Sequence, residues 1–360
     1  MKSLARIAVL CFLLVSSASP AGAAFTSLYI FGDGVSTTTN GPGGKYYHGN
    51  RYCNGRVWVE VLAQRQGIVY DPSRNWSYFG HYSPNLVTNV NKFSAPADAN
   101  TALFVVWVNN ADFVYNINHY APYTSNNLAT WNNAIHRSVT NHLQVIQTLH
   151  AKGARTLVMP NTVDLTKVPY YVGLPAASRS FVRQRIVDFN AAFAGMLNEA
   201  RASLPGITIH APDTFALLEE LLAQSATYGL TNVLQNGLSV DALSDPSLTD
   251  KSLNGPGANY IFWDYLDPTA RAHAVIADSV HHLISPVRIG KITPLHGSNV
   301  LEVINLPIGR DGFVEASANL ANWSITTNVH SAEATQDIAI ALSGSLQFYR
   351  LRFPFSWSWP

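Results

Sequence analysis

Acidic and amide side chains that are able to do chemistry gather at a few points of this chain. They are Asp33, Asn109, Asp112, Asp264 and Asp267. Two carboxylates with a water molecule between them form an acid–base arrangement for direct hydrolysis. Carboxylate and amide oxygens are also the ligands that Ca²⁺ prefers. In a third interpretation Asp33 and Asp112 only make loop-capping hydrogen bonds. Asp264 and Asp267, three residues apart, then face a pocket, where each raises the pKa of the other.

The elements around these residues predict how they are positioned. Apolar runs typical of buried strands are followed by polar segments such as Asn109 to Asp112, which we predict to be a loop. Amphipathic stretches between them predict helices. Predicted strands cover 27–31, 102–108, 156–159 and 207–210, and predicted helices cover 56–66, 131–151, 181–204, 214–224 and 271–283. This alternation predicts a mainly parallel sheet covered on both faces, with Gly34, Asn109 and Asn161 clustered beyond the carboxyl ends of its strands.

The composition changes after Ser285-Pro286. From about residue 290 the chain shows short alternating runs at 300–303, 312–316, 338–342 and 348–351, separated by turn residues. This pattern predicts a small antiparallel β module. The predicted domains are therefore a main domain over 25–286 and the module over 290–360. A module of this size has a marginal core of its own, so we expect it to dock on the main domain.

Bulk properties limit the partners and the compartment. The chain of 360 residues is 47% hydrophobic and 12% charged, with a net charge of +1 that argues against nucleic acid as a partner. Residues 1–24 have the pattern of a secretory signal peptide: Lys2 and Arg6 precede an apolar run, and small residues follow. We therefore expect a secreted or periplasmic protein without an integral membrane segment after signal removal. Cys53 is then the only mature cysteine, so no internal disulfide can form, and we expect a small buried residue there.

Several segments carry a family resemblance over about residues 26–284. Gly32-Asp33-Gly34-Val35-Ser36 resembles the first block of GDSL, or SGNH, esterases and lipases, and Asp264-Tyr265-Leu266-Asp267-Pro268 resembles the last. The stretches 54–62, 75–80, 106–113, 188–190 and 228–233 resemble further segments in the family's order. The resemblance implies an α/β protein with the flavodoxin-like three-layer α/β/α SGNH-hydrolase fold, a parallel sheet, and ester hydrolysis by descent.

The same resemblance assigns roles, and the residues present do not fill them. The family's serine position is Gly34 and its histidine position is Asp267. Ala111 stands at the oxyanion asparagine, and Asn109 replaces a glycine of the same block. Acyl transfer of this kind needs a hydroxyl nucleophile, a base, a carboxylate that orients the base, and oxyanion donors. Of these, Asp264 and the backbone amides of Gly34 and Gly80 remain, and removing the hydroxyl at Gly34 leaves room for about one water.

Three further residues are spare candidates. Ser36 matches a second serine of the first block, two residues after the nucleophile position. His273 matches a second histidine six residues after the catalytic one, where a structural role is expected. His81, beside Gly80, is the better spare base, although a surface position in its loop is the simpler interpretation. Ester hydrolysis through Ser36 and one of these histidines is one alternative.

The sequence thus leaves several functions open. The chain is interpreted as a secreted hydrolase-like protein whose serine catalysis is lost, with a small-molecule ester or glycan as its ligand. A non-catalytic glycan-binding protein and a remade hydrolase with aspartates and water are the alternatives. No cofactor is expected, and a Ca²⁺ site at the carboxylates is a minor alternative. Aromatic loop residues suited to sugar recognition, or only to loop packing, are Tyr46, Tyr47, Trp76, Tyr78, Tyr82, Tyr115 and Tyr120.

Overall fold

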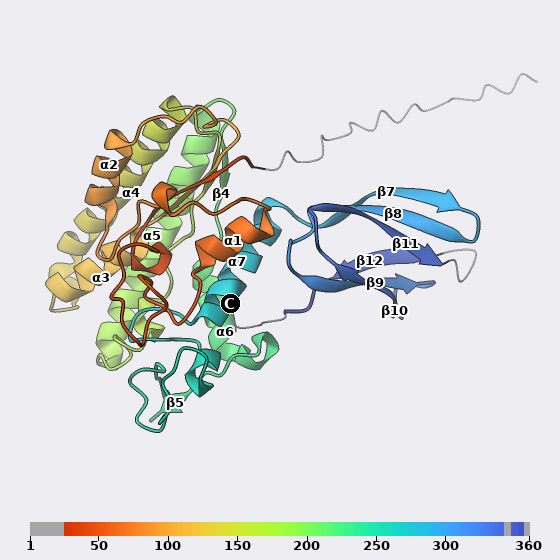
Figure 1. Cartoon of the computed structure of the whole chain (residues 1–360). Helices are drawn as coiled ribbons and strands as arrows, with labels where there is room; N and C mark the ends of the chain where they lie inside the picture. Colours follow the sequence, from red (N-terminus) through yellow and green to blue (C-terminus); the bar gives the residue numbers. More distant parts are fainter. Residues whose placement is uncertain (1–24, 342–346, 356–360) are drawn as a thin grey trace, which may run out of the picture.

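A parallel sheet forms the centre of the computed structural model, which describes residues 25–341 and 347–355 (Figure 1). Its strands are β1 (Leu28–Gly32), β2 (Leu103–Trp107), β3 (Thr156–Val158) and β4 (Thr208–His210), in that spatial order. On the free edge of β1, Asn75 forms an isolated parallel bridge to Ile30, and the Trp76 amide donates to the Ile30 carbonyl at 2.8 Å. This segment can be counted as an edge strand that follows β1 in the chain. The five strands, numbered along the chain, then have the spatial order 2-1-3-4-5 of flavodoxin-like sheets. The predicted signal peptide lies outside the described residues.

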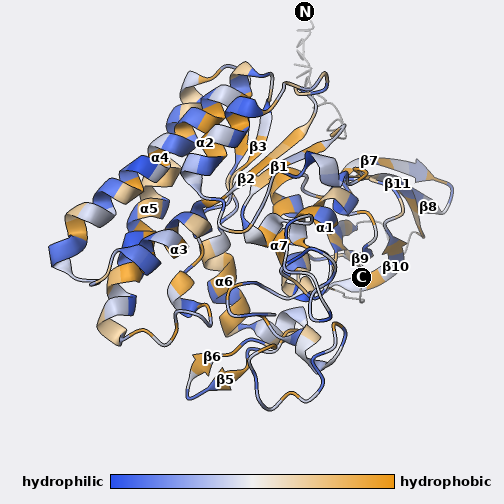
Figure 2. Ribbon diagram, turned by 60° about the vertical axis from the view of Figure 1, so that its left-hand side comes forward, coloured by the Kyte–Doolittle hydropathy of each residue, from blue (hydrophilic) through white to orange (hydrophobic). Residues whose placement is uncertain are grey.

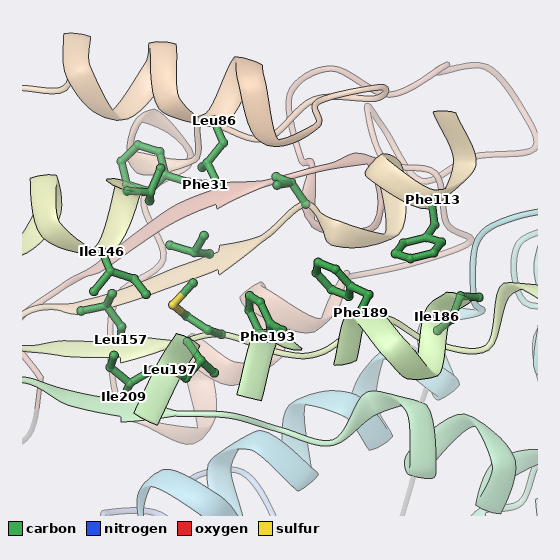
Figure 3. Close-up of a cluster of buried hydrophobic side chains, with 14 of the residues drawn as sticks. Phe31, Leu86, Phe113, Ile146, Leu157, Ile186, Phe189, Phe193, Leu197 and Ile209 are labelled. Atoms are coloured by element: carbon green, nitrogen blue, oxygen red, sulfur yellow. The ribbon is translucent and has the colours of Figure 1, made fainter. Parts of the chain in front are cut away.

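Helices cover both faces of the sheet, so the three-layer prediction is confirmed. Alternate residues of each strand point to opposite faces, which is why the strands read as continuous apolar runs. Leu28 and Ile30 pack with α1 (Trp58–Arg65) and α7 (Ala270–Ile284). Phe31 and Phe104 pack on the other side, where α2 (Ser83–Lys92), α4 (Leu128–Ala151) and α5 (Ala176–Ser203) lie. Figure 2 shows the apolar strands enclosed between these layers, and Figure 3 shows Phe31, Leu157, Phe189 and Phe193 within the larger core.

Shorter elements connect the layers. The remaining helices of the main domain are α3 (Asn109–His119) and α6 (Thr214–Ala223), and a small hairpin joins β5 (Leu234–Gln235) to β6 (Leu238–Ser239). Single 3₁₀ turns span Gly34–Ser36, Pro72–Arg74, Ser125–Asn127, Leu165–Lys167, Ser225–Tyr228 and Pro256–Asn259. No helix of the described residues has both the length and the apolar character needed to cross a bilayer.

Two helices differ from the sequence-based expectation. Asn109 to Asp112, predicted as a polar loop, forms the first turn of α3, and α2 was not predicted. Both helices are amphipathic with narrow apolar stripes. The buried apolar residues are only Leu86 and Val90 in α2 and only Phe113 and Ile117 in α3. A stripe of two apolar residues gives too weak a helical period to stand out from a polar loop.

Six strands after α7 form two antiparallel sheets, as the alternating pattern predicts. They are β7 (Arg288–Leu295), β8 (Ser298–Ile304), β9 (Asp311–Ser317), β10 (Ser324–His330), β11 (Thr335–Ala341) and β12 (Phe348–Arg352). The sheet orders are β11-β8-β7 and β10-β9-β12, around a separate core that includes Leu301 and Val314. Leu342, the last residue of one predicted strand, lies outside the described residues. This module meets the main domain at Asp278 of α7, which pairs with Arg65 at 2.8 Å and with Arg310.

Candidate functional site

A cavity of about 260 Å³ opens at the carboxyl ends of the central strands. Asp33 and Gly34, which follow β1, line it together with Gly80, Ala111 of α3 and Asp267. These five residues come from four separate segments. Of the three residues predicted to cluster at this edge of the sheet, Gly34 lines the cavity, whereas Asn109 and Asn161 do not. The rest of the wall is largely apolar, with Val163, Leu217, Leu218, Leu221, Ile261 and Ile276 among its residues. The cavity thus has one polar end and a long apolar wall.

Asp33 is held at the polar end by backbone groups. Its carboxylate caps the 3₁₀ turn after β1, where Oδ1 accepts from the Val35 amide at 3.1 Å. The backbone of Ala111, in the first turn of α3, also hydrogen-bonds to it. Burial nevertheless raises the pKa of Asp33 to about 7, because the hydrogen bonds only partly offset the loss of water. Asp33 therefore changes its charge near neutral pH.

Asp264 and Asp267 lie in a tight loop before α7. Asp264 Oδ1 accepts from the amides of Leu266 and Asp267, both at 2.9 Å, and its Oδ2 accepts from the Tyr47 hydroxyl at 3.1 Å. Burial raises the pKa of Asp264 despite these bonds. Asp264 does not line the cavity, so the prediction that it faces the pocket is wrong: its oxygens are turned to the loop backbone and Tyr47.

The Asp267 carboxyl is in a different situation, since it lines the cavity and is only 4% exposed. Its side chain hydrogen-bonds to the Asp264 carboxyl, which requires a proton on one of the two acids. Burial raises the pKa of Asp267 well above the usual range, and the nearby carboxyls of Asp264 and Asp33 raise it further. Asp267 is thus an acid whose neutral form is favoured.

Aromatic rings lie beside Gly34. A side chain at position 34 would bring its Cβ to 3.1 Å from Cδ2 of Phe79, so the room predicted for a water beside Gly34 is partly filled by that ring. Phe79 stacks on Tyr52 with ring centroids 4.9 Å apart. Gly80 follows with a φ of +73°, a left-handed conformation that glycine adopts without strain. Phe79 was not among the predicted site residues, because an exposed phenylalanine in a loop carries no chemical signature.

Asn109 and Asp112 are not part of the cavity, although both were predicted to join it. Asn109 is fully buried, and its Nδ2 donates to the Pro160 carbonyl at 2.8 Å. The Asp112 carboxylate accepts from the Ser83 amide at 3.1 Å, from the Ser83 hydroxyl at 2.9 Å and from the Ser138 hydroxyl at 2.7 Å. Because both belong to α3 rather than to a loop, their side chains are directed by the helix into its packing contacts. They have structural roles.

The spare candidates are also engaged elsewhere. Ser36 is fully buried, and its Oγ accepts from the Trp58 indole at 3.0 Å. His273 Nδ1 accepts from the Trp58 backbone amide at 3.2 Å, and burial lowers its pKa to about 3. His81, expected at the surface, is fully buried: its Nδ1 pairs with the Gly32 carbonyl at 2.8 Å and its ring stacks on Tyr78. None of the three lines the cavity.

A histidine that sequence reasoning missed does line the cavity. His119, at the end of α3, stacks on Tyr115 with ring centroids 4.1 Å apart, and Tyr115 stacks on Tyr82 at 5.2 Å. Tyr115 and His119 are one helical turn apart, so a correct prediction of α3 would have placed them on the same face of the helix. The buried Cys53, whose thiol pKa is raised by burial, takes no part. Among the described residues there is no group of three or more His, Cys, Asp or Glu side chains suited to hold a metal ion.

Comparison with known proteins identifies the framework. The family model of the GDSL-like Lipase/Acylhydrolase matches residues 28–280. The chain belongs to this family. A GDSL esterase/lipase of Arabidopsis thaliana is 22% identical over 169 residues, which are 44% of this chain and 45% of that protein. The match thus spans less than half the length of this curated relative.

Solved structures of low identity are also similar to this chain. An extracellular lipase of Streptomyces rimosus is 16% identical, with a TM-score of 0.42, over 72% of this chain and 99% of the lipase. An acetylxylan esterase of Geobacillus stearothermophilus is 12% identical, with a TM-score of 0.41, over 73% of this chain and 95% of the esterase. Gly34, Ala111 and Asp267, which the sequence resemblance predicts at the positions of the serine, the oxyanion asparagine and the histidine, all line one cavity.

Proposed function

We propose that this chain is a secreted GDSL-family protein that binds an acylated small molecule in the cavity and has lost ester hydrolysis by a serine. One observation carries the proposal: Gly34, Ala111 and Asp267 meet at the same end of one cavity. The alignment of the motifs is therefore supported in three dimensions, and the replaced residues occupy the place where the chemistry would occur. The family's hydroxyl, amide and imidazole are replaced together.

The expected loss of rate is large. Losing the nucleophile and its base costs about 10⁴- to 10⁶-fold, and losing one oxyanion donor costs about 100- to 1000-fold, although such losses are not additive. The three spare candidates of the sequence do not compensate. Ser36, His81 and His273 are bound to other protein groups outside the cavity. Residual catalysis at most is expected.

The wall of the cavity supports an acyl group as the part that is bound. Aliphatic side chains from the 3₁₀ turn at Leu165, from α6 and from α7 offer dispersion contacts and no hydrogen bonds to sugar hydroxyls. The stacked rings of Tyr82, Tyr115 and His119 lie at the edge of this wall and suit a polar or glycosyl portion of the same ligand. A ligand with an apolar acyl end and a polar remainder fits both features.

A second function is supported by the two carboxyls that line the cavity. After burial and the Asp264 carboxyl, the Asp33 carboxyl also raises the pKa of Asp267, and two carboxyls in different surroundings can divide the roles of acid and base. In a remade hydrolase one would protonate the leaving group while the other activated a water. This candidate makes a separable prediction, because Asp267→Asn would then abolish all turnover.

The experiment is hydrolysis of p-nitrophenyl acetate and octanoate by the natural chain and by the Gly34→Ser/Ala111→Asn/Asp267→His variant. The restored variant is expected to exceed the natural chain by at least about 100-fold. A second restored variant that also carries Phe79→Leu controls for the close approach of that ring to position 34. Fast hydrolysis by the natural chain that Ser36→Ala abolishes would refute the proposal, and fast hydrolysis that Asp267→Asn abolishes would establish the remade hydrolase instead.

A further inference from the structure

The electrostatic character of the polar end of the cavity is opposite to what ester hydrolysis requires. An esterase site supplies hydrogen-bond donors, because negative charge develops on the oxygen of the substrate. Here the side-chain donor is replaced by Ala111, and the imidazole is replaced by the acceptor Asp267. Together with Asp33, the cavity end now presents two carboxyls where the family places one.

No cation among the described residues neutralises these carboxyls. Besides burial, the main influences on the pKa values of Asp33, Asp264 and Asp267 are backbone amides, the Tyr47 hydroxyl and other carboxyls. In addition to these three acids, the carboxyls are those of Asp112, which acts on Asp33, and Asp241, which acts on Asp264. Neither lysine nor arginine lines the cavity, and His119, on the aromatic stack, is the histidine that does. Buried carboxyls are normally paired, since burial of an unpaired charge is costly.

The Asp267 carboxyl gives an independent indication that a ligand completes the site. It is only 4% exposed, it lines the cavity, and its side-chain hydrogen bond is to another acid, Asp264. Its neighbour Asp264 differs in this respect, because two amides and a hydroxyl also donate to that residue. A buried carboxyl that is paired with another carboxyl and faces an apolar cavity lacks the positively charged partner that a bound cation would supply.

We propose that the cavity binds an amine with an apolar body, with its ammonium group against Asp267 and Asp33 and its hydrocarbon part along Leu217, Leu218 and Ile276. An ammonium carries three N–H donors and one positive charge, so it can serve both carboxyls at once with charge-assisted hydrogen bonds. This inference rests on the proposed function, since it specifies the ligand of the same cavity. It makes the polar head group of that ligand a cation.

The experiment is calorimetric titration of the purified mature chain with n-octylamine, n-octanol and octanoate, which share one chain and differ in the charge of the head group. The amine is expected to bind at least about tenfold more tightly than the alcohol, and octanoate more weakly than both. In Asp267→Asn the advantage of the amine over the alcohol is expected to fall to about threefold or less, with the affinity for octanol unchanged. Asp188→Asn, an exposed carboxylate on α5, is the matched control for net charge and is expected to leave all three affinities unchanged.

The outcomes distinguish failure of the proposed function from failure of the preference for a cation. If octanol and octanoate bind as tightly as the amine, the proposed function stands and the preference for a cation is refuted. If none of the three binds, the cavity is not an apolar ligand site and both proposals fail. A pH series adds a check that depends on the carboxyls: amine affinity is expected to rise between pH 5 and pH 8 in the natural chain and to rise less in Asp267→Asn. Equal pH dependence in the two proteins would contradict the assignment of Asp267.

Discussion

Asp112 and Asp267 are both buried aspartates, and their surroundings are opposite. Three hydrogen-bond donors from Ser83 and Ser138 converge on the Asp112 carboxylate. The Asp267 carboxyl hydrogen-bonds to another acid, Asp264, and the carboxyl of Asp33 is close enough to raise its pKa further. Burial raises the pKa of both, but only for Asp112 do serine hydrogen bonds and the nearby His142 oppose that rise.

The difference shows how a structural acid is distinguished from a site acid. A buried carboxylate with its donors in place stabilises the protein around it, here by joining α2, α3 and α4. A buried carboxyl that faces other carboxyls destabilises the folded state when it is ionised, and it persists where a ligand or a reaction uses it. The same residue type, at similar burial, thus has opposite consequences for stability.

The largest expected effect is that of Asp112→Ala. The substitution leaves the Ser83 amide and two hydroxyls buried without their acceptor, so we expect the free energy of unfolding to fall by about 3 kcal/mol. Urea unfolding followed by circular dichroism measures this change. Asp267→Ala is the matched comparison and is expected to cost far less. Equal losses in the two variants would remove the distinction between the two carboxyls.

The next effect has the opposite sign. We expect Asp267→Asn to raise the free energy of unfolding by about 1–2 kcal/mol at pH 8, because it removes a charge that burial disfavours. The pKa of Asp267 is raised in the folded state, so the folded protein holds this proton more tightly than the unfolded chain does. Its contribution to stability therefore falls as the pH rises above about 4, the unfolded value. The advantage of the asparagine variant should accordingly be smaller at pH 5 than at pH 8.

Buried histidines also make the stability depend on pH, and their contribution must be separated from that of Asp267. The pKa values of His273 and His281 are lowered to about 3 and about 4, so both are neutral when folded and lose stability as the pH falls below about 6.5. This loss is common to the natural chain and to Asp267→Asn, and it cancels in their difference. Thermal unfolding of the two proteins across pH 5 to 8 measures that difference. A difference that does not change with pH would mean that Asp267 is not the titrating group.

The smallest effect concerns Ser36. Its hydroxyl accepts from the buried Trp58 indole, so Ser36→Ala leaves one donor unsatisfied and should lower the free energy of unfolding by about 1 kcal/mol. Hydrolysis of p-nitrophenyl acetate should stay at the level of the natural chain. A selective loss of hydrolysis with unchanged stability would assign Ser36 to catalysis and undo the contrast drawn above.

Much of the framework is predictable from the sequence, and the reasons are physical. Fully buried parallel strands give continuous apolar runs, as in β1 and β2, and long amphipathic helices such as α5 give a strong period. The motif order placed Gly34, Ala111 and Asp267 at one site, and the structure brings them together. Strand ends in a parallel sheet share one edge, so loops that are distant in sequence had to meet there.

The errors arise where side-chain direction depends on a helix that was not foreseen. Because Asn109 and Asp112 lie on α3, they point into its packing and away from the cavity, although they follow a strand. His81 is buried because it precedes α2 and its ring stacks on Tyr78, and no local sequence pattern predicts this burial. His119 was missed for the same reason, since it lies on α3, whereas Phe79 lines the cavity from a loop without any local sequence signal.

The most direct test of the central claim is labelling with a fluorophosphonate, which forms a phosphonyl bond to an activated serine oxygen and releases fluoride. We would treat the purified protein with an excess of the reagent and measure its intact mass, beside the Gly34→Ser/Ala111→Asn/Asp267→His variant. The account predicts no adduct on the natural chain and a single adduct at position 34 of the variant. A stoichiometric adduct on Ser36 of the natural chain would show that a working serine site exists and would contradict the account.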